Sequence, residues 1–185
     1  MTRFFLLAAS AALLTACGGQ ALRYDLPPTQ AAERIPVSVG SVEVRDVSLP
    51  LYARQEVIFF EGPDGALESD DNLLWADDPQ RSFTEGLAFS LAAQTRARVA
   101  AEPWPFFERP DVRLDVRVSR ALPGRDGIYR LEGQYFVAAT EGARRDVARR
   151  FEFSAPYDGQ DVASIAAAKS RLIDDLAARI ARDGL

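Results

Sequence analysis

Val112-Arg113-Leu114-Asp115-Val116-Arg117-Val118-Ser119 is the stretch of this 185-residue chain that decides its fold. Apolar and polar residues alternate strictly along it, which is the pattern of a strand with one buried and one solvated face. The segment 123–127 (PGRDG) then has the composition of a turn, and strand-like runs follow at 129–140 and 146–154. Because the connections between these runs are too short for crossovers, they predict an antiparallel meander.

Upstream of this meander, two more strands and one helix are expected. Residues 37–44 alternate apolar and polar, and residues 55–60 are rich in β-branched and aromatic side chains, so each run predicts a strand. Asp78-Pro79 is a good helix start, because aspartate caps free amides and proline fits the first turn. A second helix is predicted over 161–182, where apolar residues form one stripe.

The element order is therefore strand, strand, helix, three strands and a final helix. Strands with one apolar face need a cover, and two amphipathic helices can supply it. We predict the α+β fold class, as a two-layer sandwich in which a mostly antiparallel sheet of about five to six strands carries both helices on one face.

The N-terminus has the pattern of a bacterial lipoprotein signal. Arg3 precedes an apolar run from Phe4 to Leu14, and the run ends in the lipobox Leu14-Thr15-Ala16-Cys17. The run is too short for a transmembrane helix, which needs roughly 20 apolar residues. A plain secretory signal with an incidental cysteine is the alternative. We expect cleavage between Ala16 and Cys17 and attachment of diacylglyceryl and acyl groups, such as palmitate, to Cys17.

This interpretation divides the chain into a signal peptide (1–16), a lipidated cysteine with its tether (17–34) and one domain (35–185). Within the tether, Arg23–Leu26 could form a short strand that enters the domain. Gly18, rather than aspartate, follows the cysteine and favours delivery to the periplasmic face of the outer membrane.

Composition narrows the chemistry. The chain has no histidine, the commonest general base and zinc ligand, and Cys17 is its only cysteine. Its 27 acidic against 22 basic residues make it a poor partner for nucleic acid, and they argue against binding of anionic headgroups by net charge alone. Phosphate-binding glycine loops and nucleophile elbows are missing from the sequence. We expect no enzyme, no catalytic residue, no metal site, no nucleic-acid partner and no cofactor beyond the lipid on Cys17.

Two further patterns have ordinary interpretations. The acidic residues between Glu68 and Asp78 do not follow a calcium-loop spacing, so a solvated loop with a helix cap is the preferred interpretation. Lys169 lies on the apolar stripe of the second helix, where we expect a snorkelling edge residue.

Aromatic segments carry more information. Trp75 precedes the first helix, Trp104 stands between two prolines with Phe106 beyond it, and Tyr52 belongs to a third apolar loop. Tryptophan and tyrosine are favoured at interfaces because they bury large areas at modest entropy cost. These four residues are therefore candidate partner-binding residues. The alternative is that the rings staple the helix ends to the sheet.

These segments also carry a resemblance. The lipobox, Arg23–Pro27, Val42–Tyr52, Asn72–Pro79 and Pro103–Pro105, in this order and spacing, resemble the ABC-type transport auxiliary lipoproteins, and the PqiC (YmbA-like) group in particular. The resemblance covers essentially the whole mature chain.

The resemblance implies a non-enzymatic envelope protein that helps to maintain membrane integrity. Relatives work with MCE-domain proteins, which form rings or tubes thought to carry lipids between membranes. The implied partners are an MCE-domain protein, ABC transporter subunits and further copies of the chain. Two alternatives remain open: a lipid carrier, in which Phe59, Phe106, Phe136 and Phe151 could line a cavity, and a structural lipoprotein of envelope assembly.

Overall fold

A computed structural model describes residues 20–28, 34–142, 144–159 and 161–185. The expected signal peptide and the lipidation site Cys17 lie outside the described residues. None of the described helices is both long and apolar enough to cross a membrane.

The main sheet has five strands in the order β5-β2-β6-β7-β8. Its members are β2 (Ser41–Val44), β5 (Arg98–Ala101), β6 (Val112–Pro123), β7 (Ile128–Ala139) and β8 (Val147–Pro156). The three long strands form the expected antiparallel meander. β2, however, pairs in parallel with both β5 and β6, so the sheet is mixed rather than mostly antiparallel. The return from β2 to β5 runs through a helix, which permits parallel pairing.

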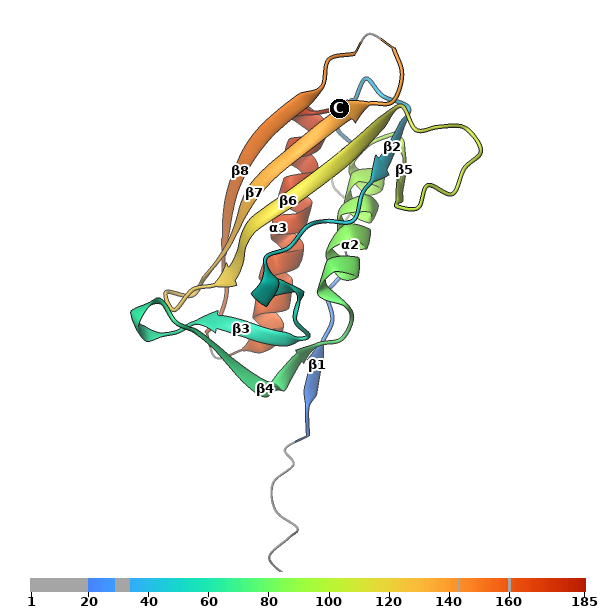
Figure 1. The fold of residues 1–185 in the computed structure, drawn as a ribbon. Helices are drawn as coiled ribbons and strands as arrows, with labels where there is room; N and C mark the ends of the chain where they lie inside the picture. Colours follow the sequence, from blue (N-terminus) through green and yellow to red (C-terminus); the bar gives the residue numbers. More distant parts are fainter. Residues whose placement is uncertain (1–19, 29–33, 143, 160) are drawn as a thin grey trace, which may run out of the picture.

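A second, three-stranded sheet crosses one end of the molecule in the order β1-β4-β3 (Figure 1). Its strands are β1 (Leu22–Tyr24), β3 (Val57–Glu61) and β4 (Leu67–Trp75), and it carries the short 3-10 helices η2 (Leu51–Arg54) and η3 (Pro63–Gly65) beside it. β1 confirms the short entering strand. β4 corrects the expected acidic loop: its first six residues are exposed, so they show no alternation, and backbone pairing with β3 holds them extended.

Both helices cover one face of the main sheet, as predicted. They are α2 (Pro79–Gln94) and α3 (Val162–Asp183), and they pack against each other and against opposite halves of the sheet (Figure 1). The side chain of Asp78 accepts a hydrogen bond from the backbone of Arg81 at 2.8 Å, and Asp161 caps α3 in the same way. These are the caps that the sequence indicates.

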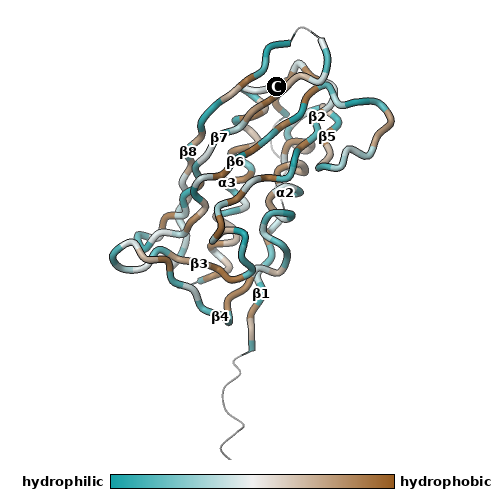
Figure 2. The backbone as a smooth tube through the Cα atoms, viewed as in Figure 1, coloured by the Kyte–Doolittle hydropathy of each residue, from teal (hydrophilic) through white to brown (hydrophobic). Residues whose placement is uncertain are grey.

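The core lies between the sheet and the helices. Val112, Leu114, Val116 and Val118 of β6 are buried there together with apolar residues of both helices. Figure 2 shows the resulting alternation of apolar and polar residues along β6 and β7. The opposite sheet face is not covered by any helix of the described structure, which leaves the polar half of the alternation exposed.

Candidate functional site

The connection from β5 to β6 presents Phe107, the most exposed aromatic side chain of the described structure, and a second exposed phenylalanine, Phe106. We call Pro103–Pro110 the aromatic loop. Phe107 is fully exposed and Phe106 is 41% exposed, whereas Trp104 is half-buried. The loop lies toward the end of the domain opposite β1 (Figure 1).

Local contacts hold this loop in shape. The rings of Trp104 and Phe106 meet edge to face at 4.9 Å, and the Trp104 indole donates a hydrogen bond to the Glu108 carbonyl at 2.6 Å. The guanidinium of Arg98, a residue of β5, also lies over the Phe106 ring, 4.8 Å from its centre. A preorganised aromatic surface loses little entropy on binding, so this loop is suited to recognition.

Trp75 occupies the opposite kind of environment. It is the last residue of β4, is only 8% exposed and belongs to the hydrophobic core. The ammonium of Lys169 lies 4.2 Å from the centre of its ring. The structure therefore places Trp75 where the stapling alternative expects it, with little accessible surface for a partner.

Lys169 itself is buried, not a snorkelling edge residue, with 3% of its surface exposed. It borders a cavity of about 20 Å³ together with Tyr52, Trp75 and Tyr129. Among the described residues, no carboxylate forms an ion pair with it. Burial lowers the pKa of the Lys169 ammonium to about 8, because the charged form loses its hydration.

Tyr52 belongs to the same neighbourhood as Trp75. It is half-buried, and its hydroxyl accepts a hydrogen bond from the backbone amide of Ala121 at 3.1 Å. The centres of the Tyr52 and Phe59 rings lie 6.4 Å apart, edge to face. The four candidate residues thus form two pairs: Trp104 with Phe106 in the aromatic loop, and Tyr52 with Trp75 around Lys169.

The phenylalanines of the carrier alternative do not share one cavity in the described structure. Phe59 borders the 20 Å³ cavity, which is too small for an acyl chain, and Phe106 lies in the aromatic loop. Phe136 and Phe151 border a third place, a hollow on the open face of the main sheet.

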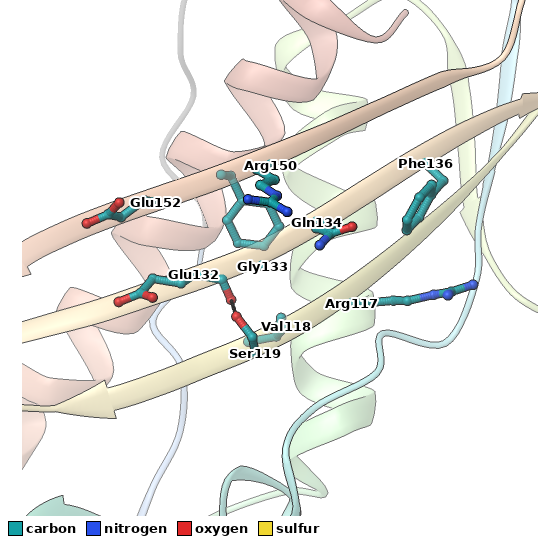
Figure 3. Close-up of a pocket in the computed structure, with 10 residues that line it drawn as sticks. Arg117, Val118, Ser119, Glu132, Gly133, Gln134, Phe136, Arg150 and Glu152 are labelled. Atoms are coloured by element: carbon teal, nitrogen blue, oxygen red, sulfur yellow. Dashed lines mark hydrogen bonds between the residues drawn. The ribbon is translucent and has the colours of Figure 1, made fainter.

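This open-face hollow has a volume of about 660 Å³ (Figure 3). It lies where β6 carries a bulge between Val118 and Arg120. Opposite the bulge, a Cβ at Gly133 would approach the Arg117 carbonyl to 2.3 Å and the Phe151 ring to 2.8 Å, so only glycine fits. An isolated glycine inside a strand pattern signals such a close approach, and this signal was available in the sequence.

The described residues form an α+β domain that presents a preorganised aromatic loop, a feature suited to binding. The chain belongs to the family of ABC-type transport auxiliary lipoprotein components, whose model matches residues 24–181. This match confirms the resemblance found in the sequence.

Solved structures also resemble this chain. A crystal structure of an uncharacterized protein matches with a TM-score of 0.72 at 17% identity, over 88% of this chain and 97% of the other. Protein XCC0632 from Xanthomonas campestris matches with a TM-score of 0.71 at 17% identity, over 87% and 93%. The PelC dodecamer from Paraburkholderia phytofirmans gives a TM-score of 0.45 at 16% identity, over 84% and 94%. At 17% identity, the first two structures show a shared fold alone. A comparison with curated proteins finds no match.

Proposed function

We propose that this protein is an outer-membrane-anchored periplasmic lipoprotein that docks a lipid-conducting partner, as the non-enzymatic auxiliary component of an MCE/ABC-type lipid transport system. Its family is described as an auxiliary component of ABC-type transport. The observation that carries the proposal is the exposed aromatic loop at the end of the domain opposite β1.

The position of β1 supports an anchor at one end and a docking surface at the other. Leu22, Arg23 and Tyr24 are already paired with β4, so only the chain before Leu22 is free to act as a tether. Four residues separate Cys17 from Leu22. Fully extended, they reach roughly 14 Å at about 3.5 Å per residue. The three-stranded sheet would then lie close to the outer membrane, and two or more acyl chains on Cys17 would give stable anchoring.

The aromatic loop would meet the partner on the other side. Exposed phenylalanines on a rigid loop gain most when they enter an apolar pocket, and such anchors dominate interface energies. An MCE-domain protein would supply that pocket, and ABC transporter subunits would be reached through it.

Co-purification from native envelopes tests this proposal. The full-length lipoprotein is expected to capture an MCE-domain protein, and Phe107→Ser is expected to abolish the capture. Phe89→Ser is the matched control, because Phe89 is also exposed, at 66%, but lies on α2. Equal capture by both variants would show that the aromatic loop is not the docking surface.

Anchoring is tested separately. Labelled palmitate is expected to be incorporated into the wild-type protein and not into Cys17→Ser, and the labelled protein is expected in the outer-membrane fraction. Incorporation into the Cys17→Ser variant would contradict the assigned lipidation site.

A further inference from the structure

The open-face hollow gathers charges that the fold does not neutralise. Its side chains project from β6, β7 and β8 on the sheet face that the helices leave bare (Figure 3). Arg117, Gln134 and Arg150 are cross-strand neighbours in one row with two arginines, and Glu132 and Glu152 form the next pair on the same face. A basic row thus lies beside an acidic row.

The acidic row is unfavourable for the protein by itself. Glu132 and Glu152 lie directly opposite each other on antiparallel strands, and like charges in such pairs are destabilising. Arg120, the neighbour of Glu132 on β6, is ion-paired with Glu61 of β3. Within the described part of the chain, no basic side chain lies within ion-pair distance of either glutamate.

The basic row also has free capacity. Arg117, which precedes the bulge, binds both carboxylate oxygens of Asp115 at 2.9 and 3.1 Å, and its guanidinium lies 4.9 Å from the centre of the Phe136 ring. Arg150 has no ion pair among the described residues. A guanidinium of this kind binds phosphate oxygens through two parallel hydrogen bonds.

We propose that the open-face hollow binds the zwitterionic headgroup of a phospholipid, with its ammonium between Glu132 and Glu152 and its phosphate on Arg150. The two rows lie roughly 7 Å apart, at about 3.4 Å per strand residue, so one dipolar headgroup can reach both. The charge pattern alone selects an amine joined to a phosphate; the choice of a lipid as its source rests on the proposed function.

A headgroup fits the hollow better than a protein surface does. Small-molecule sites measure about 300–1,000 Å³, a range that includes this hollow of about 660 Å³. The centres of protein interfaces are depleted in charged residues and enriched in aromatic ones. Here the accessible side chains are mostly charged, and Phe136 is already covered by Arg117.

Titration with soluble dihexanoyl-phosphatidylethanolamine tests the site, and dihexanoyl-phosphatidylglycerol, which lacks the amine, is the comparison lipid. We expect the ethanolamine lipid to bind more tightly, and the double variant Glu132→Gln, Glu152→Gln to remove that preference. Arg150→Gln is expected to weaken binding of both lipids by about tenfold, as for loss of one charge-assisted contact. Glu141→Gln, an exposed glutamate on the β7–β8 connection, is the matched control.

Unfolding of the lipid-free protein provides a second readout. The double glutamine variant is expected to melt at a higher temperature than the wild type, because a repulsive pair is removed while binding is lost. No binding of the ethanolamine lipid, or an unchanged preference in the double variant, would overturn the proposal. So would a change of oligomeric state in that variant, since it would assign the face to a second copy of the chain. Capture of an MCE-domain protein is measured with Arg150→Gln as well. If this variant still captures the partner, a failure of the headgroup proposal does not imply a failure of the docking function.

Discussion

Two tryptophans that have similar surroundings in the sequence have opposite roles in the structure. Trp75 and Trp104 each have an acidic residue and a proline within four residues and lie near the end of a strand. Trp75 is buried on Lys169 at the junction of the two sheets, whereas Trp104 supports an exposed loop.

The difference comes from backbone pairing. Trp75 is paired with Tyr24 of β1, and its amide donates a hydrogen bond to the Glu56 carbonyl at 2.8 Å, so its side chain is fixed between strands and helix α3. Among the described residues, the Trp104 side chain donates its hydrogen bond to Glu108 of its own loop. An aromatic residue fixed by two strands contributes to the fold, and one fixed by its own loop remains available to a partner.

The largest expected effect is on stability at Trp75. Trp75→Ala should lower the free energy of unfolding by about 3–5 kcal/mol, because it leaves a cavity in the core. Trp104→Ala should cost about 1 kcal/mol, because the ring is half-buried and its contacts are local. Urea denaturation of both variants measures the difference. Equal losses would contradict the contrast between the two regions.

Because Lys169 is buried beside Trp75, we expect the free energy of unfolding to depend on pH in an unusual way. At pH 7 the ammonium is charged in both the folded and the unfolded protein, and the folded state bears its full desolvation cost. Above pH 8 the folded protein releases the proton, while the unfolded chain keeps it up to about pH 10.5. The free energy of unfolding should therefore rise by about 2 kcal/mol between pH 7.5 and 9.5.

Lys169→Met provides the control for this rise. Because Lys169 is the only lysine of the chain, the variant should show a flat profile over the same range. Tyrosines with raised pKa, such as the buried Tyr129, lower stability only above about pH 10, outside this range. A rise that persists in the methionine variant would assign the effect to another group.

A smaller effect is expected where the Trp75 region passes into α2. Asp78→Ala should cost about 1 kcal/mol, because the Arg81 amide loses its cap. Asp77→Asn removes only an exposed ion pair with Arg81 and should cost less than about 0.5 kcal/mol. Thermal unfolding distinguishes the two neighbours. A larger loss at Asp77 would mean that the ion pair, rather than the cap, holds this helix start.

The fold was predictable where one face of an element is buried and the other is exposed to solvent. The β6–β8 meander and both helices have that property, and their periodicity identified them. β4 was missed because its exposed first residues have no periodicity. The parallel pairing of β2 was missed because its alternation of apolar and polar residues identifies a strand but not its direction or its partners.

The site was predictable only in part. Lys169 lies four residues after Ile165 and four before Ile173, so its place on the apolar helix face was predictable. The predicted snorkelling was wrong, because the ammonium packs on the distant Trp75 ring and does not reach solvent. Whether Trp75 or Trp104 faces solvent depends on contacts with distant strands, which local sequence does not specify. The charge rows of the open face required the strand register, because their members come from three separate strands.

The smallest expected effect on stability is at Phe107, and it distinguishes the aromatic loop most clearly from the Trp75 region. Phe107 is fully exposed, so Phe107→Ser should change the free energy of unfolding by less than about 0.5 kcal/mol. The same substitution is expected to abolish capture of the docking partner, whereas Trp75→Ala should reduce capture only in proportion to the protein it unfolds. Measuring stability and capture on the same preparations separates the two. A loss of stability above about 1 kcal/mol at Phe107 would make the aromatic loop part of the fold, because a ring that contacts only solvent has no packing to lose.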